Sequence, residues 1–196
     1  MVEIEKGLLS KIVAQALKQG QRPFVTVSSN SMVPLLKVGD DIQLAPASVQ
    51  DLLPGEIVVL ETRDGLLAHR FQGFDSSQEM PILVTKGDRL EKLDPPIFSD
   101  KLIGRVIARR RGRRTIYLDR GFTKFINHLL YLLSRRDIKQ RVGPYKAQGP
   151  YLNPAVERGD KPKELSSRMF FKRLRYLIAI LLTTLVDLRS LIPFRQ

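Results

Sequence analysis

The sequence predicts an all-β core that lies between an N-terminal amphipathic helix and a C-terminal helical extension. Apolar residues recur every four positions over residues 1–20, which is typical of a helix. Residues 21–119 hold short runs rich in β-branched residues, separated by Gly, Pro and Asp turns. Beyond Asp119 the strand signals stop. We therefore divide the 196-residue chain into the helix, a β domain and the extension 120–196, which contains a linker over 141–164.

The first element is an amphipathic helix. Ile4, Leu8, Ile12 and Ala16 are spaced four apart, and Gly20 is a natural C-cap. A secretory signal places positive charge before an uninterrupted apolar run, whereas here glutamates come first and lysines interrupt the run, so we expect no such signal. The apolar stripe either covers the core of the domain or rests on a membrane.

The β domain is expected to be a compact β-barrel or folded sheet, because several short strands alternate with tight turns. The turns are Gly39-Asp40, Pro54-Gly55 and Asp64-Gly65, the last being the strongest hairpin signal. The predicted strands are 24–27, 41–45, 56–61, 66–73 and 81–86, followed by a hairpin of 101–109 and 115–118.

The extension is expected to hold two helices. Helical spacing over 122–133 predicts the first, and Ser166 or Ser167 is a suitable N-cap for the second. The second contains an apolar run of 11 residues, 176–186, whereas a membrane span needs about 20. This helix either lies at a membrane interface beside a basic collar or packs on its own protein.

Charge divides the chain into two unlike halves. Residues 1–100 carry 10 Lys/Arg and 14 Asp/Glu, net −4, whereas residues 101–196 carry 23 and 6, net +17. The basic half indicates an anionic partner. We expect an anionic membrane surface and consider nucleic acid unlikely, because no helix-turn-helix, zinc finger or stacking platform is visible. The arginine-rich segment 109–114 could equally be a solvated hairpin tip. The expected location is cytoplasmic or peripherally membrane-associated.

A serine-rich corner follows the first predicted strand. Ser29 and Ser31 precede Met32-Val33-Pro34 and the Gly39-Asp40 turn. A nucleophilic serine needs an exposed hydroxyl with backbone N–H groups converging beside it, and a strand end with a turn supplies both. The alternative is an ordinary polar turn, in which serines are common.

A base for such a serine is available in the strand 66–73. The chain has two histidines, and His69 lies in this strand. Histidine is the usual base for a serine because its pKa lies near neutrality. A carboxylate from Asp88 or Asp94 could orient the imidazole. The alternatives are an ordinary strand histidine and a Gly-Asp turn. The absence of cysteine excludes disulfides, thiolate metal sites and a cysteine nucleophile.

Taken in order, these segments resemble signal peptidase I and the related LexA-like self-cleaving proteins. The resemblance covers residues 22–119. The matching segments are Ser31-Met32-Val33-Pro34, Gly39-Asp40, Pro54-Gly55-Glu56-Ile57-Val58, His69-Arg70, Thr85-Lys86-Gly87-Asp88 and Gly104-Arg105-Val106.

The resemblance implies a folded β-barrel with a nucleophilic serine. His69-Arg70 is similar to the histidine-base branch found in archaea and the endoplasmic reticulum, and the chain looks closest to small, anchorless bacterial relatives. It implies that Ser31 is the nucleophile and His69 the base, with Asp88 as the first candidate for the third member and Asp94 as the second. The Ser31 amide and the Ser29 hydroxyl would form the oxyanion hole.

We therefore expect a serine endopeptidase, needing no metal or cofactor, that processes a peptide or precursor protein in the manner of signal-peptide removal. Two other interpretations stay open. One is a non-catalytic β module that binds an anionic membrane or nucleic acid through its basic half. The other is self-cleavage, with the linker 141–164 as the easiest place to cut.

Overall fold

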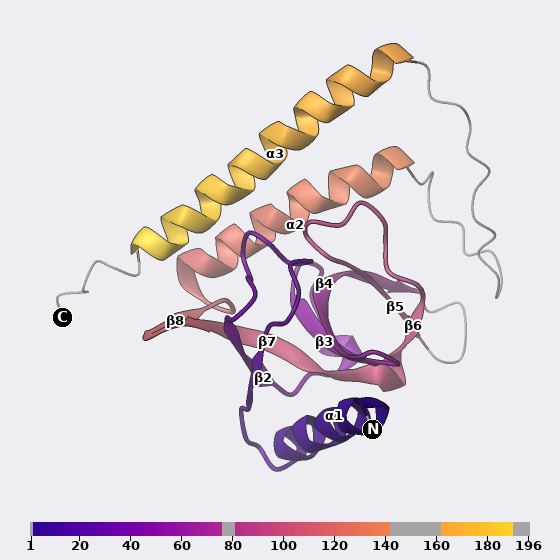
Figure 1. The fold of residues 1–196 in the computed structure, drawn as a ribbon, viewed down its shortest axis with the longest axis vertical. Helices are drawn as coiled ribbons and strands as arrows, with labels where there is room; N and C mark the ends of the chain where they lie inside the picture. Colours follow the sequence, from indigo (N-terminus) through magenta and orange to yellow (C-terminus); the bar gives the residue numbers. More distant parts are fainter. Residues whose placement is uncertain (1, 76–80, 142–161, 190–196) are drawn as a thin grey trace.

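The computed structural model describes residues 2–75, 81–141 and 162–189, and its core is an antiparallel β-sheet flanked by α-helices (Figure 1). The sheet has eight strands in the order β1-β2-β7-β3-β4-β5-β6, with β8 paired to β7. Two single-turn 3₁₀ helices, Val49–Asp51 and Ser99–Lys101, lie between strands. The strands are β1 Phe24–Thr26, β2 Asp41–Ala45, β3 Ile57–Thr62, β4 Gly65–Asp75, β5 Ile82–Lys86, β6 Ile97–Phe98, β7 Leu102–Arg111 and β8 Arg114–Tyr117. The helices are α1 Val2–Lys18, α2 Gly121–Arg141 and α3 Pro162–Arg189.

The predicted elements are present, with two differences. Strand β6 was not predicted, because it has two residues and follows a Pro-Pro pair that is typical of a loop. Helix α3 begins at Pro162 and not near Ser166 or Ser167. Proline suits the first turn of a helix, because the N–H it lacks would have no partner there. Residues 142–161, most of the expected linker, lie outside the described residues.

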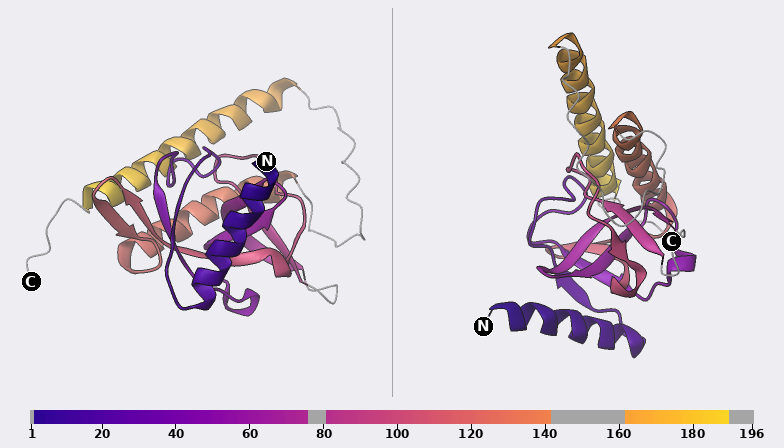
Figure 2. Two further views of the ribbon diagram at one scale, coloured as in Figure 1. Left: turned by 60° about the horizontal axis from the view of Figure 1, so that its bottom comes forward. Right: turned by 90° about the vertical axis from the view of Figure 1, so that its right-hand side faces the viewer.

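The helices cover opposite sides of the sheet. Helix α1 lies on one side, and α2 and α3 lie side by side on the other (Figures 1 and 2). Val13 and Leu17 of α1 are buried in the main hydrophobic core, together with Ile126 of α2 and Val186 of α3. Burial of Val13 and Leu17 supports the interpretation that the apolar stripe of α1 covers the core of the domain. Ile12, which was placed on the inward stripe, is exposed instead.

Strand β4 runs through the middle of this arrangement, between β3 and β5. Its hairpin with β3 turns where the Asp64-Gly65 signal predicts it, and Gly65 has φ +110°, a conformation that other residues rarely adopt. Among the described residues, no helix is long and apolar enough to cross a bilayer.

Candidate active site

Three segments that are far apart in the sequence bring Ser31, His69 and Asp94 into one hydrogen-bonded chain. Ser31 lies in the loop between β1 and β2, His69 on β4, and Asp94 in the loop that follows β5. The Ser31 Oγ is 2.8 Å from His69 Nε2, and His69 Nδ1 is 2.6 Å from Asp94 Oδ2. Because a carboxylate only accepts, the Nδ1–H must donate to Asp94, which leaves Nε2 to accept the Ser31 hydroxyl proton.

Asp94 is itself held in place by β5. The Thr85 hydroxyl donates to Asp94 Oδ2 at 2.7 Å, and the Asp94 backbone N–H donates to the Thr85 carbonyl at 2.9 Å. Thr85 is fully buried, and the side chains of His69 and Asp94 are 3% and 9% exposed. Hydrogen bonds shielded from water in this way are electrostatically stronger and fix the ring orientation.

Asp88, the first candidate for the third member, does not contact His69, and this prediction needs correction. Both of its oxygens accept from the Arg70 guanidinium, at 2.6 and 2.7 Å. Neighbouring residues on a strand point to opposite faces, so Arg70 directs its side chain away from the face that carries His69. Asp88 lies on the Arg70 side, and Asp94, the second candidate, lies against the imidazole.

The pair of Arg70 and Asp88 ties helix α2 to the sheet. Arg70 is completely buried and also donates to the Gly55 carbonyl at 2.6 Å and to the side-chain oxygen of Asn127 at 2.5 Å. Asn127 lies on α2, so the guanidinium joins three separate segments. Sequence reasoning did not assign this role to Arg70, although its place next to His69 in a predicted strand was a signal that the two face opposite ways.

The loop after β5 also presses against the serine. The Arg89 backbone N–H donates to the Ser31 carbonyl at 2.9 Å. A Cβ added at Gly87 would lie 2.9 Å from that carbonyl oxygen and 3.0 Å from His69 Nε2. Only glycine therefore fits at this position without displacing its neighbours, a requirement that the Gly87-Asp88 turn signal alone does not reveal.

The remaining predicted residues are placed as follows. The Ser29 hydroxyl is exposed and lies 3.2 Å from the Ser31 hydroxyl. His128 lies on α2 beside Tyr131, with ring centroids 5.7 Å apart, and takes no part in the chain of hydrogen bonds. In the part of the chain that the structure describes, no group of His, Asp and Glu side chains is arranged to hold a metal ion.

The arginine run supports the fold as well as carrying charge. Arg109 is buried and donates to the Leu35 carbonyl at 2.8 Å and to Asp187 of α3. Arg111 donates to Asp40 at 2.6 Å and to Asp187 at 3.2 Å. The hydrogen bond with Asp40 raises the pKa of Arg111. The solvated-tip interpretation is therefore wrong for Arg109, whose guanidinium connects α3 to the loop between β1 and β2 that carries Ser31, which we call the serine loop.

Arg110, the neighbour of these two arginines, makes a half-buried pair with Asp41 at 2.9 Å. A hydrogen bond from Thr26 and the pairing with Arg110 lower the pKa of Asp41. This pair fastens β7 to β2 at the base of the serine loop.

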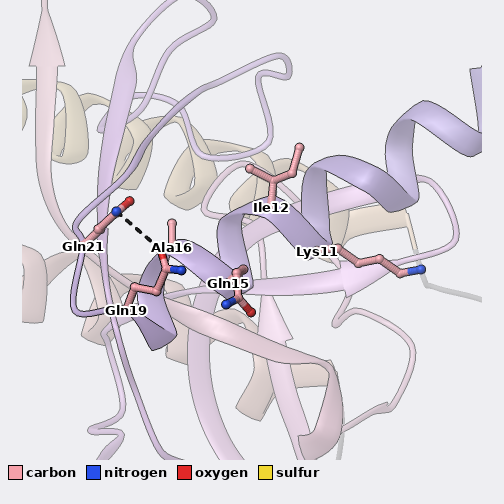
Figure 3. Close-up of a pocket in the computed structure, with 6 residues that line it drawn as sticks. All are labelled: Lys11, Ile12, Gln15, Ala16, Gln19 and Gln21. Atoms are coloured by element: carbon pink, nitrogen blue, oxygen red, sulfur yellow. Dashed lines mark hydrogen bonds between the residues drawn. The ribbon is translucent and has the colours of Figure 1, made fainter.

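An open pocket of about 450 Å³ lies on the outer side of α1, away from these residues (Figure 3). Three of its six lining residues are glutamines, of which Gln21 donates to Gln19 at 3.5 Å. Its lining contains no hydroxyl, thiol, imidazole or carboxylate, so we assign it no chemistry.

Comparison with known proteins identified no relative: no family model, no curated protein and no solved structure matches the chain significantly.

Proposed function

We propose that the protein is a serine peptidase of the signal-peptidase type, with Ser31 as nucleophile, His69 as general base and Asp94 as the residue that orients the imidazole. One observation carries the proposal. A hydroxyl, an imidazole and a carboxylate lie in one chain of hydrogen bonds, at 2.8 and 2.6 Å, which is the arrangement that activates a serine.

The reaction follows from this order of groups. The Ser31 Oγ attacks the carbonyl carbon of the scissile peptide bond while its proton passes to His69 Nε2. Asp94 stabilises the imidazolium that forms. The C–N bond then breaks as the imidazolium returns the proton to the leaving amine nitrogen. Water, deprotonated by His69, attacks the carbonyl carbon of the resulting ester of Ser31. The ester C–O bond breaks, the imidazolium returns the proton to the Ser31 Oγ, and the acid product leaves.

The negative oxygen of the tetrahedral intermediate needs donors that are already in place. The Ser29 hydroxyl, 3.2 Å from the Ser31 Oγ, and the Ser31 backbone N–H are the groups that we assign to it. Removal of one such donor raises the barrier by roughly 3–4 kcal/mol in comparable sites.

The antiparallel sheet supports the finer fold assignment, a signal-peptidase or LexA-like folded barrel. The motif segments converge as that resemblance implies: the serine loop, the His69 strand and the Gly87 loop meet at one place. The substrate class that the resemblance implies is a peptide or precursor protein with small side chains at P1 and P3.

The decisive experiment is labelling of the purified chain by a fluorophosphonate probe, with the modified residue identified by mass spectrometry. We expect the wild type to react at Ser31, and both Ser31→Ala and His69→Ala to lose the reaction. Ser28→Ala is the matched control, because Ser28 is an exposed serine in the same corner. A wild type that stays unlabelled, or labelling that survives Ser31→Ala, would refute the proposal. Cleavage of Ala-x-Ala peptides, compared across the same variants, then tests the substrate class.

A further inference from the structure

Helix α3 presents a predominantly apolar face away from the protein, interrupted by Thr184. We define the α3 outer face as Leu177, Ile180, Leu181, Leu185 and Leu188, which lie on one side of the helix. Leu177 and Leu181 are 61% and 60% exposed, and the other three are also exposed. The opposite side of the helix carries the residues that pack on the protein, Val186 and Thr183, which are 3% and 5% exposed.

This outer face is unusual for a helix that is bathed in water. A surface helix normally carries polar and charged residues on the side away from the core. Residues 176–186 contain no charged residue, and the hydroxyl of the exposed Thr184 donates to the Ile180 carbonyl at 2.8 Å, so the outer face stays predominantly apolar. Contiguous exposed apolar surface of this kind marks a docking site.

Cationic residues flank the apolar stretch in the sequence at one end and through the fold at the other. In the sequence, Lys172, Arg173 and Arg175 come directly before the apolar stretch. At the other end, Asp187 binds β7, which brings the β7–β8 hairpin with its exposed Arg113 and Arg114 next to the end of α3 (Figure 1). An apolar strip between cationic groups matches the boundary between acyl chains and anionic headgroups.

We propose that α3 docks its outer face on an anionic membrane surface, with the helix lying in the plane of the interface. A second copy of the chain fits less well, because pairing would bring together two halves of net charge +17. Nucleic acid fits less well too, since five apolar side chains offer no donor to a phosphate. This inference does not depend on peptidase activity.

Docking through α3 would orient the whole protein. Val186 packs in the main core, and Asp187 binds Arg109, which in turn holds the Leu35 carbonyl of the serine loop. Helix α1 lies on the opposite side of the sheet (Figures 1 and 2). Its own exposed apolar residues, such as Leu9 at 45%, therefore face away from a bilayer that contacts α3.

The experiment is co-sedimentation of the full chain with phosphatidylcholine vesicles, with and without phosphatidylglycerol, at ionic strengths of about 0.1 M and about 1 M. The test variants are Leu177→Glu and Leu181→Glu, singly and combined, and Leu9→Glu on α1 is the control that matches each single variant in charge. All three positions are exposed, so the folds should survive, and thermal unfolding checks this.

We expect the wild type and Leu9→Glu to bind only the vesicles that contain phosphatidylglycerol, and more weakly at high salt. The double variant should bind at least about tenfold more weakly, since burial of two leucine side chains in the membrane contributes well over 1.4 kcal/mol to binding. Equal binding by the wild type and the double variant, or no binding by the wild type, would overturn the proposal. So would loss of vesicle binding in Leu9→Glu alone. A dimer that Leu177→Glu and Leu181→Glu dissociate, without vesicle binding, would assign the face to a second copy instead.

Discussion

Replacing Asp94 and Asp88 in turn by asparagine tests which carboxylate serves the proposed reaction and which one stabilises the fold. Both substitutions keep the shape of the side chain and remove one negative charge. Asp94 contacts His69 Nδ1 at 2.6 Å, whereas Asp88 holds the buried Arg70 through two bonds. We therefore expect Asp94→Asn to lose mainly reactivity and Asp88→Asn to lose mainly stability.

Asp94→Asn is expected to impair reactivity far more than stability. The amide nitrogen of asparagine donates a hydrogen bond, so the proton of the imidazole would move from Nδ1 to Nε2. A protonated Nε2 can no longer accept the Ser31 hydroxyl proton. The corresponding change in serine proteases lowers kcat by about 10⁴. The loss of stability should be about 1 kcal/mol, the value of a typical hydrogen bond.

Asp88→Asn is expected to impair stability far more than reactivity. Arg70 is 0% exposed and Asp88 7%, so the substitution leaves a buried charge without its counterion. Breaking such a pair costs about 3–5 kcal/mol, and the lower end applies because asparagine still accepts one bond. For a chain of this size, 3 kcal/mol corresponds to roughly 6–12 °C in Tm.

The assay is the second-order rate of fluorophosphonate labelling at Ser31, measured on folded protein, together with urea unfolding of each variant. The roles assigned to the two carboxylates are wrong if Asp88→Asn abolishes labelling at unchanged stability while Asp94→Asn labels at the wild-type rate. They are equally wrong if both variants lose stability alike and neither loses labelling.

Three further perturbations follow from the contacts described. Gly87→Ala places a Cβ 3.0 Å from His69 Nε2, so the imidazole must shift, and labelling of Ser31 should fall by about 10²-fold. Asp187→Ala removes the α3 partner of the buried Arg109; because Asp187 is 38% exposed, we expect a loss of only about 1–2 kcal/mol in urea unfolding. Asp41→Asn tests a pH effect. Because the Thr26 hydrogen bond and Arg110 lower the pKa of Asp41 in the folded state, its contribution is present above the usual pKa of 3.8 and is lost as pH falls below it. The variant should therefore show a flatter loss of Tm with acid.

Matched controls accompany two of these perturbations. Gly7→Ala introduces the same methyl group on α1 with nothing within 4 Å, and should leave labelling unchanged. Asp119→Ala removes an exposed carboxylate that lies 3.9 Å from Arg120, and should leave stability nearly unchanged. If Gly87→Ala labels like Gly7→Ala, the close packing around the imidazole has no catalytic consequence. If Asp187→Ala behaves like Asp119→Ala, the tie between α3 and Arg109 does not stabilise the fold.

Local pattern was enough to place most of the elements. The predicted strand 41–45 coincides with β2, and the Asp64-Gly65 turn lies where β3 returns as β4. Periodicity and turn chemistry act over a few residues, so a sequence contains these signals directly. Local signals also made the serine corner and the strand histidine visible as candidates, and the ordered set of motif segments, through its resemblance to a known family, then selected Ser31 and His69.

The choice between Asp88 and Asp94 was decided only by the tertiary structure. Both carboxylates follow β5 in the sequence, and nothing local distinguishes them. The difference arises because His69 and Arg70 are neighbours on β4 and point to opposite faces of the sheet. The imidazole therefore binds Asp94 on one face, and the guanidinium binds Asp88 on the other. The burial of Arg109, in a run that composition alone describes as basic surface, has the same origin. Pairing across long stretches of chain depends on which faces the sheet brings together, and that information is absent from any short window of sequence.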